Sequence, residues 1–408
     1  MIVNVKGLGY IGLPTALMLA SHGVQVVGTD RSKELVESLN EGKLTFEEKG
    51  LDELFQSARD AGIQFQTEDI KADMYIVAVP TPYDKRTKKT DAKYVVSAVN
   101  EVLSICPKGA IIVVESTISP STIDKNVRPL VAAHGLTVGE DVHLAHAPER
   151  IIPGNMLYEL KHNSRTIGTD SVEIAEKVKQ VYGSFCEGEI VLTDIRTAEM
   201  TKVVENTFRD INIAYANELA KICRADGMDV YEVIRIANKH PRVNILTPGP
   251  GVGGHCISVD PWFLVGDYPD IADIIRAARR VNDGMPEFVL KRIYSIMKEN
   301  GITDTERVGL YGLTYKENVD DTRESPTLQL LHSMDEHLAG GRIKVYDPYV
   351  KRELIPNQYH DFDKFLADVD MVVILVGHDE IHENMDKLKG KVVLDTRNIC
   401  QLDGVYKL

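Results

Sequence analysis

The stretch VKGLGYIGLP, close to the start of the chain, most constrains what this sequence can fold into. Gly7, Gly9 and Gly12 form a GxGxxG pattern that directly follows an apolar strand candidate and opens a helix candidate. Glycines at this spacing permit a tight turn, a close approach of the backbone to a pyrophosphate, and close helix–strand packing. The next strand candidate ends at Asp30, where a carboxylate accepts hydrogen bonds from an adenosine ribose. The pattern predicts a dinucleotide site that favours NAD over NADP, a preference that Arg31 softens.

Short apolar strand candidates alternate with helical stretches in both halves of the chain. Strands that are apolar throughout and separated by helices indicate a parallel sheet that is covered on both faces. The predicted fold class is therefore α/β, with two Rossmann-like doubly wound parallel-sheet domains joined by a helical middle. The strand candidates are 2–7, 24–30, 74–80, 110–116, 143–147 and 189–194, then 307–313, 342–348, 371–377 and 391–398, and helical stretches include 92–105 and 171–183.

The middle of the chain is predicted to be helical. One long helix runs from Thr197, a plausible N-cap, to about Ala225, before a stop at Gly227, and a second helical region covers 271–299. Apolar residues at helical spacing predict a buried stripe on the long helix. Because this stripe is longer than one domain face needs, we predict a homodimer, or a dimer of dimers, through this helix. The stripe comprises Met200, Val204, Ile211, Tyr215 and Ile222.

Composition excludes several classes of partner. The chain has 408 residues and a net charge of −14, whereas a nucleic-acid-binding protein normally shows a basic face. Five widely spaced cysteines without a CxxC pair predict free thiols, a reducing cytoplasm and no metal site. No apolar run approaches the length of a membrane span, and no signal peptide is recognisable. We expect a cytoplasmic protein that acts on a small molecule.

The stretch PGPGVGGHCISVDPWF, residues 248–263, places Cys256 among four glycines and three prolines. Pro and Gly at this density predict a rigid, irregular segment whose backbone can come close to a ligand. Two interpretations of Cys256 are equally compatible with this stretch. The thiol is either a catalytic nucleophile or a small apolar side chain buried beneath the loop.

Three polar residues on the long helix lie at spacing i, i+4, i+7, namely Lys202, Asn206 and Arg209. They share one face, opposite the apolar stripe. An ordinary solvated face is one interpretation. The other is catalytic, because the helix follows a dinucleotide domain and the oxidation of an alcohol needs a group that handles its proton. This pattern alone would also suit a two-electron hydroxyacid dehydrogenase.

A cysteine near a nicotinamide changes the chemistry that is available. An aldehyde formed by a first hydride transfer does not readily give a second hydride until a nucleophile has added to it. A thiolate adds to give a hemithioacetal, hydride loss gives a thioester, and water releases an acid. Cys256 therefore implies four-electron oxidation of a primary alcohol to a carboxylate. Lys202 and Asn206 could then stabilise an oxyanion, and Asp260 could orient or activate water.

Two further loops follow strand candidates at the edge where ligands bind in such sheets. They are VPTP, residues 79–82, and ESTISPST, residues 115–122. Thr81 and Thr117 could contact the nicotinamide half or the ribose. Capping of the next helix by either hydroxyl is an equally good interpretation.

Taken in order along essentially the whole chain, these motifs resemble the UDP-glucose/GDP-mannose dehydrogenase family. The resemblance rests on GLGYIGLP, the KxxxN of the long helix, GGHC followed by Asp260, YKENVDDTRESP at 315–326 and LDTRN at 394–398. It implies an NAD-binding Rossmann domain (1–196), a central helical domain with the catalytic Lys, Asn and Cys (197–300), and a UDP-sugar-binding Rossmann-like domain (301–408). It also implies oxidation of a nucleotide sugar at C6 with two NAD consumed, to supply an acidic sugar for a surface polysaccharide.

The resemblance also implies roles for single residues. Cys256 would be the nucleophile and Lys202 the general acid/base, supported by Asn206 and Asp260, whereas the other cysteines, 106, 186, 223 and 400, would be structural. The implied NAD contacts are Gly7, Gly9, Tyr10, Ile11, Gly12, Asp30, Thr81, Thr117 and Arg323. The implied substrate contacts are Glu149, Arg150, Ile151, Arg209, His240, Arg242, Gly253, Tyr315, Lys316 and Arg397.

Within that family, residues 240–263 are most similar to the branch that acts on UDP-N-acetyl-D-mannosamine. The UDP-glucose branch typically has a lysine where this chain has Val259, and a second glutamate where this chain has Pro153. UDP-glucose, UDP-N-acetylglucosamine and UDP-N-acetylgalactosamine remain rival substrates, and a catalytically dead nucleotide-sugar-binding regulator remains a rival function. A diphosphate needs arginines and lysines converging in a cleft, although a surface ion pair is the plain alternative for Arg150 and Arg209, and loop capping is the plain alternative for His240.

Overall fold

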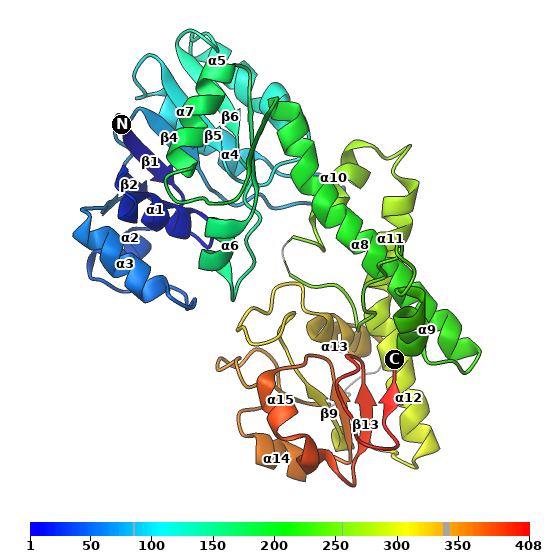
Figure 1. Ribbon diagram of the computed structural model, residues 1–408. Helices are drawn as coiled ribbons and strands as arrows, with labels where there is room; N and C mark the ends of the chain where they lie inside the picture. The colour runs from blue at the N-terminus through cyan, green and yellow to red at the C-terminus, as the bar shows by residue number, and fades with distance from the viewer. Residues whose placement is uncertain (85, 255, 338–342) are drawn as a thin grey trace. The chain divides into compact units, whose positions relative to one another are not determined.

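The computed structural model describes residues 1–84, 86–254, 256–337 and 343–408. The chain divides into two compact units, Met1–Glu205 and Asn206–Leu408, and each is built around its own sheet (Figure 1). Within the part of the chain that the structure describes, no helix combines the length and apolar character needed to cross a membrane.

The sheet of the first unit has the strand order β3-β2-β1-β4-β5-β6-β7-β8. Helices connect the strands and cover the sheet. The strands are β1 (Ile2–Lys6), β2 (Gln25–Thr29), β3 (Gln64–Gln66), β4 (Met74–Val77), β5 (Ala110–Val114), β6 (Val142–His146), β7 (Arg165–Thr169) and β8 (Ile190–Thr193). The helices are α1 (Gly12–Ser21), α2 (Lys33–Asn40), α3 (Leu51–Asp60), α4 (Lys93–Leu103), η1 (Ile123–Val127), α5 (Arg128–Ala133), α6 (Met156–His162) and α7 (Val172–Tyr182).

The six strands predicted for the first half are confirmed, but the expectation of an entirely parallel sheet is wrong at one pair. β7 runs antiparallel to β6, with Ala145 opposite Thr169. The sequence of β7, RTIGT, lacks the continuous apolar run that identified the other strands, so the reversal of the chain before it left no signal. The short strand β3, QFQ, was missed for the same reason.

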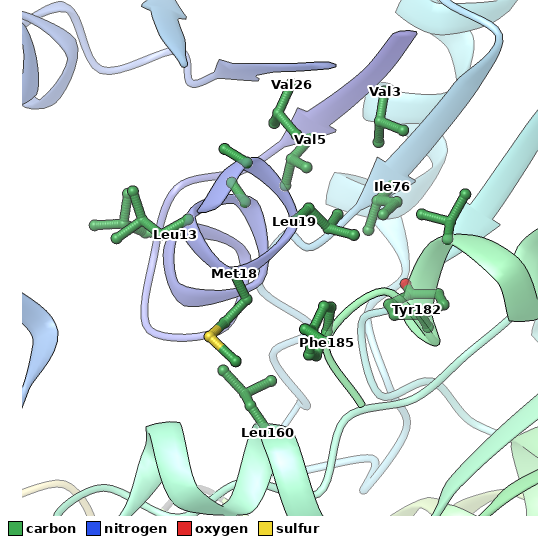
Figure 2. Packing of buried hydrophobic residues seen from close by; sticks show 14 of the residues in the cluster. Val3, Val5, Leu13, Met18, Leu19, Val26, Ile76, Leu160, Tyr182 and Phe185 are labelled. Carbon is green, nitrogen blue, oxygen red and sulfur yellow. The ribbon is translucent and has the colours of Figure 1, made fainter. Parts of the chain in front are cut away.

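Alternate residues of each central strand pack on opposite faces of this sheet. Val3, Val5 and Ile76 face a core that includes α1, α3, α6 and α7, and Tyr75 and Val77 face α4, η1 and α5. Figure 2 shows the first of these cores, with Leu13, Met18 and Leu19 of α1 among side chains from β1, β2, β4 and α6. Full burial of one such aliphatic side chain contributes about 1.5–3 kcal/mol, which makes the sheet a rigid support for its edge loops.

The sheet of the second unit is wholly parallel, in the order β11-β10-β9-β12-β13-β14. Its first five strand positions repeat the winding of β3-β2-β1-β4-β5, so the prediction of a second doubly wound sheet is confirmed. The strands are β9 (Val308–Tyr311), β10 (Lys344–Tyr346), β11 (Gln358–Tyr359), β12 (Met371–Ile374), β13 (Val392–Asp395) and β14 (Tyr406–Lys407). The helical segments are α9 (Val230–Ala237), α10 (Asp260–Asp267), α11 (Asp273–Asp283), α12 (Met285–Glu299), η2 (Thr305–Arg307), α13 (Pro326–His337), α14 (Phe362–Ala367), α15 (Asp379–Glu383) and η3 (Met385–Leu388).

Helices of the central region share one core with the second sheet. Ala216, Val230 and Val289, from α8 (Ile195–Ala225), α9 and α12, belong to the same buried cluster as Leu310 and Val373 of the strands. The opposite face of the sheet carries its own cluster beneath α14 and α15 (Figure 1). The predicted helical region 271–299 is interrupted at Gly284, where α11 ends and α12 begins, with Pro286 in the first turn of α12.

Helix α8 (Ile195–Ala225) is the predicted long helix, and it begins two residues earlier than expected. Thr197 is not its N-cap. Asp194 takes that role, because its carboxylate accepts hydrogen bonds from the Thr197 backbone N–H at 3.0 Å and from the Thr197 hydroxyl at 2.6 Å. Gly227 follows the end of the helix with φ +72°, as the predicted stop requires.

The burial of α8 differs from the pattern that periodicity predicted. Lys202 and Asn206, for which a solvated face was one of two interpretations, are each only 6% exposed, whereas Arg209 is exposed. Of the predicted buried stripe, Val204 is 46%, Tyr215 53% and Ile222 50% exposed. The prediction of a buried stripe is therefore wrong for these three residues, and the buried side of α8 combines polar side chains with small apolar ones such as Ala216 and Ala220.

Candidate active site

The glycine-rich turn after β1 has the geometry that its three glycines predicted. Gly7 has φ +95°, and a Cβ there would lie 2.4 Å from the Ala78 carbonyl oxygen. A Cβ on Gly12 would lie 1.9 Å from the Gly7 carbonyl oxygen. A Cβ on Gly9 would instead meet no atom of the described protein within 4 Å. The backbone at Gly9 is thus open to an approaching ligand, while the other two glycines shape the turn. This arrangement fits the pyrophosphate of a dinucleotide.

Asp30 lies beside this turn, at the end of β2. One carboxylate oxygen accepts the Leu8 N–H at 2.8 Å and the other accepts the Ser32 N–H at 2.8 Å. The residue is half-buried, so its carboxylate is fixed and still reachable. The guanidinium of Arg31 makes hydrogen bonds to Glu101 and Ser97.

The other predicted cofactor residues surround the same edge of the sheet. Tyr10 is 40% exposed and its ring lies 4.4 Å from that of Phe46, and Ile11 is the residue before α1. Thr81 is buried and Thr117 half-buried, in the loops that follow β4 and β5. Neither threonine caps the following helix, because the residues at those positions are Ala92 before α4 and Thr122 before η1.

The neighbouring residue Ser116 ties these two loops together. Its hydroxyl accepts the Val79 N–H at 2.8 Å and donates to the Val79 carbonyl at 2.7 Å. This bridge fixes the strand-end loops relative to one another at the edge of the sheet where ligands bind.

The predicted substrate residue Glu149 belongs to a buried charge network. Its carboxylate pairs with Arg165 and accepts the backbone N–H of Arg150 at 2.7 Å. Arg165 also pairs with Glu115 at 3.2 Å, and Glu115 accepts the Tyr182 hydroxyl at 3.0 Å. Burial raises the pKa of Glu115 to about 7, although Arg165 opposes that shift.

The guanidinium of Arg150 is held by protein groups, and Ile151 beside it is buried. Arg150 makes two hydrogen bonds of 2.7 Å to the Glu205 carboxylate. It also donates to the Ser164 carbonyl at 2.9 Å and the Thr166 hydroxyl at 2.8 Å. The structure thus contains an Arg150–Glu205 ion pair, which was the alternative interpretation of Arg150.

In the second unit, a side chain of α8 makes a hydrogen bond to Asp260, the last residue of the turn that begins at Cys256. The Asn206 amide donates to the Asp260 carboxylate at 2.6 Å, and both side chains are buried. The Cys256 carbonyl accepts the Asp260 N–H at 2.8 Å, which closes a helical turn into α10. Cys256 itself is exposed, whereas Cys186, Cys223 and Cys400 are buried. The alternative of an apolar thiol buried beneath the loop is therefore wrong.

Three more polar residues of α8 support this loop and its surroundings. Asn217 accepts the Gly249 N–H at 2.9 Å and donates to Asn282 at 2.8 Å. Asp210 pairs with Arg279 at 2.6 Å and Asn212 accepts the Leu246 N–H at 3.0 Å. Lys202 lies on the turn of α8 that precedes Asn206. The buried polar side of α8 therefore carries the predicted catalytic residues Lys202 and Asn206. It also makes hydrogen bonds to the segment that contains the other two, Cys256 and Asp260.

The glycines of the cysteine loop allow it to pack against residues predicted to bind the nucleotide sugar. A Cβ on Gly253 would lie 2.6 Å from the Tyr315 Cβ, and one on Gly254 would lie 2.8 Å from the Tyr315 ring. A Cβ on Gly249 would lie 2.9 Å from a guanidinium nitrogen of Arg397. The second unit thus brings Gly253, Tyr315 and Arg397 together with the cysteine loop, while His255 lies outside the described residues.

The remaining predicted residues of the second unit differ in exposure. Lys316 is half-buried and follows Tyr315 in the chain. Arg323 is exposed, and its guanidinium pairs with Asp321 at 2.6 Å. The Arg323 carbonyl accepts the Gly254 N–H at 2.9 Å. Arg209, His240 and Arg242 are exposed. The His240 ring accepts the Arg242 N–H at 3.3 Å, as the loop-capping interpretation expected.

Comparison with known proteins shows the family of the chain. Three models of the UDP-glucose/GDP-mannose dehydrogenase family match the chain: its NAD binding domain at residues 1–186, its central domain at 196–284 and its UDP binding domain at 309–402. The chain belongs to this family of NAD-dependent oxidoreductases.

Named relatives cover almost the full chain. It is 44% identical to a UDP-N-acetyl-D-mannosamine dehydrogenase of Methanococcus maripaludis, over 98% of this chain and 93% of that protein. It is 39% identical to an NDP-N-acetyl-D-galactosaminuronic acid dehydrogenase of Ralstonia nicotianae, over 97% of this chain and 96% of that protein. A solved UDP-D-ManNAc dehydrogenase from Pyrococcus horikoshii superimposes with a TM-score of 0.91 at 37% identity, over 100% of this chain and 98% of that one.

Sequence reasoning missed several residues that support the site. Glu115 was only part of a quoted motif, and Arg165 stands in a strand that gave no signal. Glu199 of α8, fully buried, accepts the N–H groups of Ser121 and Ile123 at 2.6 and 2.9 Å. Asp210, Asn212 and Asn217 follow Lys202 and Asn206 on α8. The run of polar residues on α8 was the available signal, but periodicity singled out only Lys202, Asn206 and Arg209.

Proposed function

We propose that this chain oxidises C6 of UDP-N-acetyl-D-mannosamine to a carboxylate, with consumption of two NAD per sugar. One observation carries the chemistry: the only exposed cysteine thiol among the five begins a turn whose last residue, Asp260, is held by the buried amide of Asn206. The names of the relatives support the sugar. When bound, NAD accepts a hydride in each of the two oxidations.

Four residues of the chain have separate roles in this reaction. Lys202 takes the proton from the C6 alcohol during the first oxidation. The Cys256 thiolate then adds to the aldehyde, and Lys202 and Asn206 stabilise the oxyanion of the hemithioacetal. Loss of the second hydride leaves a thioester, and water oriented by Asp260 releases the acid and the thiol. One alcohol and one water thus give one carboxylate, two hydrides and three protons.

Binding is assigned to the three parts of the chain. Residues 1–196 bind NAD through Gly7, Gly9, Tyr10, Ile11, Gly12, Asp30, Thr81 and Thr117, with Arg323 facing it from residues 301–408. The nucleotide sugar contacts Glu149, Arg150, Ile151, Arg209, His240, Arg242, Gly253, Tyr315, Lys316 and Arg397. Cationic side chains in this set suit a diphosphate. Because NAD and nucleotide sugars are cytoplasmic metabolites, we place the reaction there.

We also propose that the exposed stripe on α8 pairs with a second copy of the chain. Val204, Phe208, Tyr215 and Ile222 are 46–64% exposed and fall on one face of the helix. Apolar side chains aligned in this way gain from burial between two protomers. A Phe208→Asp variant should sediment as a monomer at micromolar concentration while the wild-type chain sediments as a dimer. A monomeric wild-type chain would contradict the proposal.

The deciding experiment measures NADH formed per molecule of a limiting nucleotide sugar. Two NADH per UDP-N-acetyl-D-mannosamine, with UDP-glucose inactive, supports the proposal. UDP-N-acetylgalactosamine is the third substrate to compare, because a relative at 39% identity acts in that series by its name. Cys256→Ser should form the first NADH and then stall, and Cys106→Ser, at a half-buried thiol, serves as the control. One NADH per sugar from the wild-type enzyme would refute the thioester route.

A further inference from the structure

The second sheet repeats the hydrogen bonds of the dinucleotide turn almost atom for atom. In the first sheet, the Gly7 N–H donates to the Thr29 carbonyl at 2.8 Å and the Leu8 N–H to Asp30. In the second, the Gly312 N–H donates to the Tyr346 carbonyl at 2.8 Å, and the Leu313 N–H donates to the Asp347 carboxylate at 2.6 Å. Gly7 and Gly312 both have positive φ, +95° and +102°. Asp347 therefore occupies the position of the ribose-binding Asp30.

Asp347 cannot bind a ribose, because other side chains and N–H groups occupy its carboxylate. Its side chain is 0% exposed and accepts backbone N–H groups from Leu313, Thr314, Tyr349 and Val350. The Nε2 atom of His378 lies 3.1 Å from the same carboxylate. His378 is also fully buried.

The strand register of the two sheets relates the position of His378 in the sequence to that of Thr81. Lys6 pairs with Val77 in the first sheet, and the equivalent Tyr311 pairs with Ile374 in the second. His378 is four residues past Ile374, as Thr81 is four residues past Val77. The same sequence offset from the sheet thus carries a histidine in the second unit and a threonine in the first.

The tautomer of His378 follows from its partners. The Asn318 backbone N–H points at Nδ1 at 2.9 Å, so Nδ1 accepts a hydrogen bond. The ring proton is then on Nε2, which donates to Asp347. The ring therefore links the end of β10 to the loop that follows β9.

This loop carries Tyr315 and Lys316. The Thr314 hydroxyl donates to the Lys316 carbonyl at 2.8 Å, and the amide oxygen of Asn318 accepts the Asp379 N–H at 3.0 Å. Tyr315 in turn packs against Gly253 and Gly254 of the cysteine loop. His378 is thus connected through one loop to the residues assigned to the nucleotide sugar.

We propose that His378 is a positioning residue that converts the ribose site of the second sheet into a clamp on residues 314–318, and so sets the affinity for the UDP end of the substrate. The inference rests on the proposed function for the identity of the ligand. Its structural half, the clamp, does not depend on that function.

The test compares His378→Ala with two conservative variants and one matched control in the full-length enzyme. His378→Gln keeps a donor for Asp347, and His378→Asn keeps an acceptor for the Asn318 N–H. Val373→Ala removes a buried side chain from β12, which precedes His378, and leaves His378 and its hydrogen-bond partners in place. Two quantities are measured: the affinity for UDP by calorimetry, and the amide hydrogen exchange of residues 313–318.

His378→Ala should weaken UDP binding at least tenfold and speed exchange at Asn318, with the affinity for NADH unchanged. His378→Asn should protect Asn318 better than His378→Gln does. UDP affinity in His378→Ala equal to that in Val373→Ala would overturn the proposal, as would unchanged exchange at Asn318. A wild-type enzyme that binds no UDP would instead count against the proposed function, and the exchange data would still decide whether the clamp exists.

Discussion

The first and second sheets of this protein place an aspartate at the same point of the same turn, and the two aspartates differ in what can reach them. Asp30 is half-buried beside Gly9, where the backbone is open. Asp347 is sealed by four backbone N–H groups and a histidine. A shared winding order therefore does not imply a shared ligand. Two more backbone N–H groups and the His378 ring distinguish the sealed Asp347 from the reachable Asp30.

The largest effect should come from removing the sealed aspartate. Asp347→Ala leaves several buried N–H groups without an acceptor and should cost about 4 kcal/mol of unfolding free energy. Denaturant unfolding measures the loss, and NADH binding to the first unit should be unaffected. Asp347→Asn, which keeps one acceptor oxygen, should lose less. An Asp347→Ala variant as stable as the wild-type chain would show that the two aspartates do not differ in this way.

The glycines of the first turn should separate folding from binding. Gly12→Ala places a Cβ 1.9 Å from the Gly7 carbonyl oxygen, so the turn must shift, at a cost of about 1–3 kcal/mol of stability and with loss of NAD binding. Gly9→Ala meets no described protein atom and should keep wild-type stability while NAD binding falls at least tenfold. Thermal unfolding and NADH fluorescence measure the pair. Equal loss of stability in both variants would mean that Gly9 is not an open position.

Asp30→Ala should act on the cofactor more than on folding, because its carboxylate accepts two backbone N–H groups where that of Asp347 accepts four. Loss of a charged acceptor for the ribose hydroxyls should weaken NAD binding by about 2 kcal/mol, or about thirtyfold. NADP binding should weaken less or improve, because the repulsion of a 2′-phosphate is removed. Titration of the variant with both cofactors tests this. An unchanged ratio of NAD to NADP affinity would remove Asp30 from the cofactor site.

The smallest effect concerns pH. Glu199 in the first unit and Asp347 in the second should change the stability of their units in opposite directions as the pH falls. Burial raises the pKa of Glu199 in the first unit to about 7, against a usual value near 4.5. A raised pKa in the folded state means that the native protein holds the extra proton, so Glu199 lowers stability as pH rises from 5 to 7, by no more than about 2 kcal/mol. Glu199→Gln should flatten that slope in urea unfolding.

Asp347 provides the contrast. Although burial opposes it, hydrogen bonding to His378 and to backbone N–H groups lowers the pKa of Asp347 below 3.8. A lowered pKa contributes stability that is present above pH 3.8 and is lost as pH falls below that value. Hydrogen exchange at pH 3 should therefore rise first around residues 313–350. Parallel responses of the two units to acid would contradict both assignments.

Much of the fold was accessible from sequence because its strands are buried on both faces. Continuous apolar runs such as AIIVV and MVVI predict parallel strands directly, and the glycine pattern with Asp30 predicts the cofactor turn. The strands β3, β7, β11 and β14 have no such run. The direction of β7 depends on its pairing with β6, which no local pattern records.

The candidate site divides in the same way. Lys202, Asn206, Cys256 and Asp260 were selected from residue type and spacing, and the structure joins Asn206, Asp260 and the cysteine turn. Glu115, Arg165 and Glu199 were not selected, because a buried charge network is built from residues far apart in sequence. Arg150 was assigned to the substrate, and its guanidinium is engaged by Glu205, Ser164 and Thr166.

By itself, the sequence determined the fold class, the cofactor turn and the chemical types at the centre of the site. These depend on periods of two and 3.6 residues and on the backbone freedom of glycine, which are local properties. Only the tertiary structure decided which face of α8 meets the protein and which aspartate stays open. Periodicity identifies two faces of a helix, but the partner that each face meets is set by contacts between segments distant in sequence.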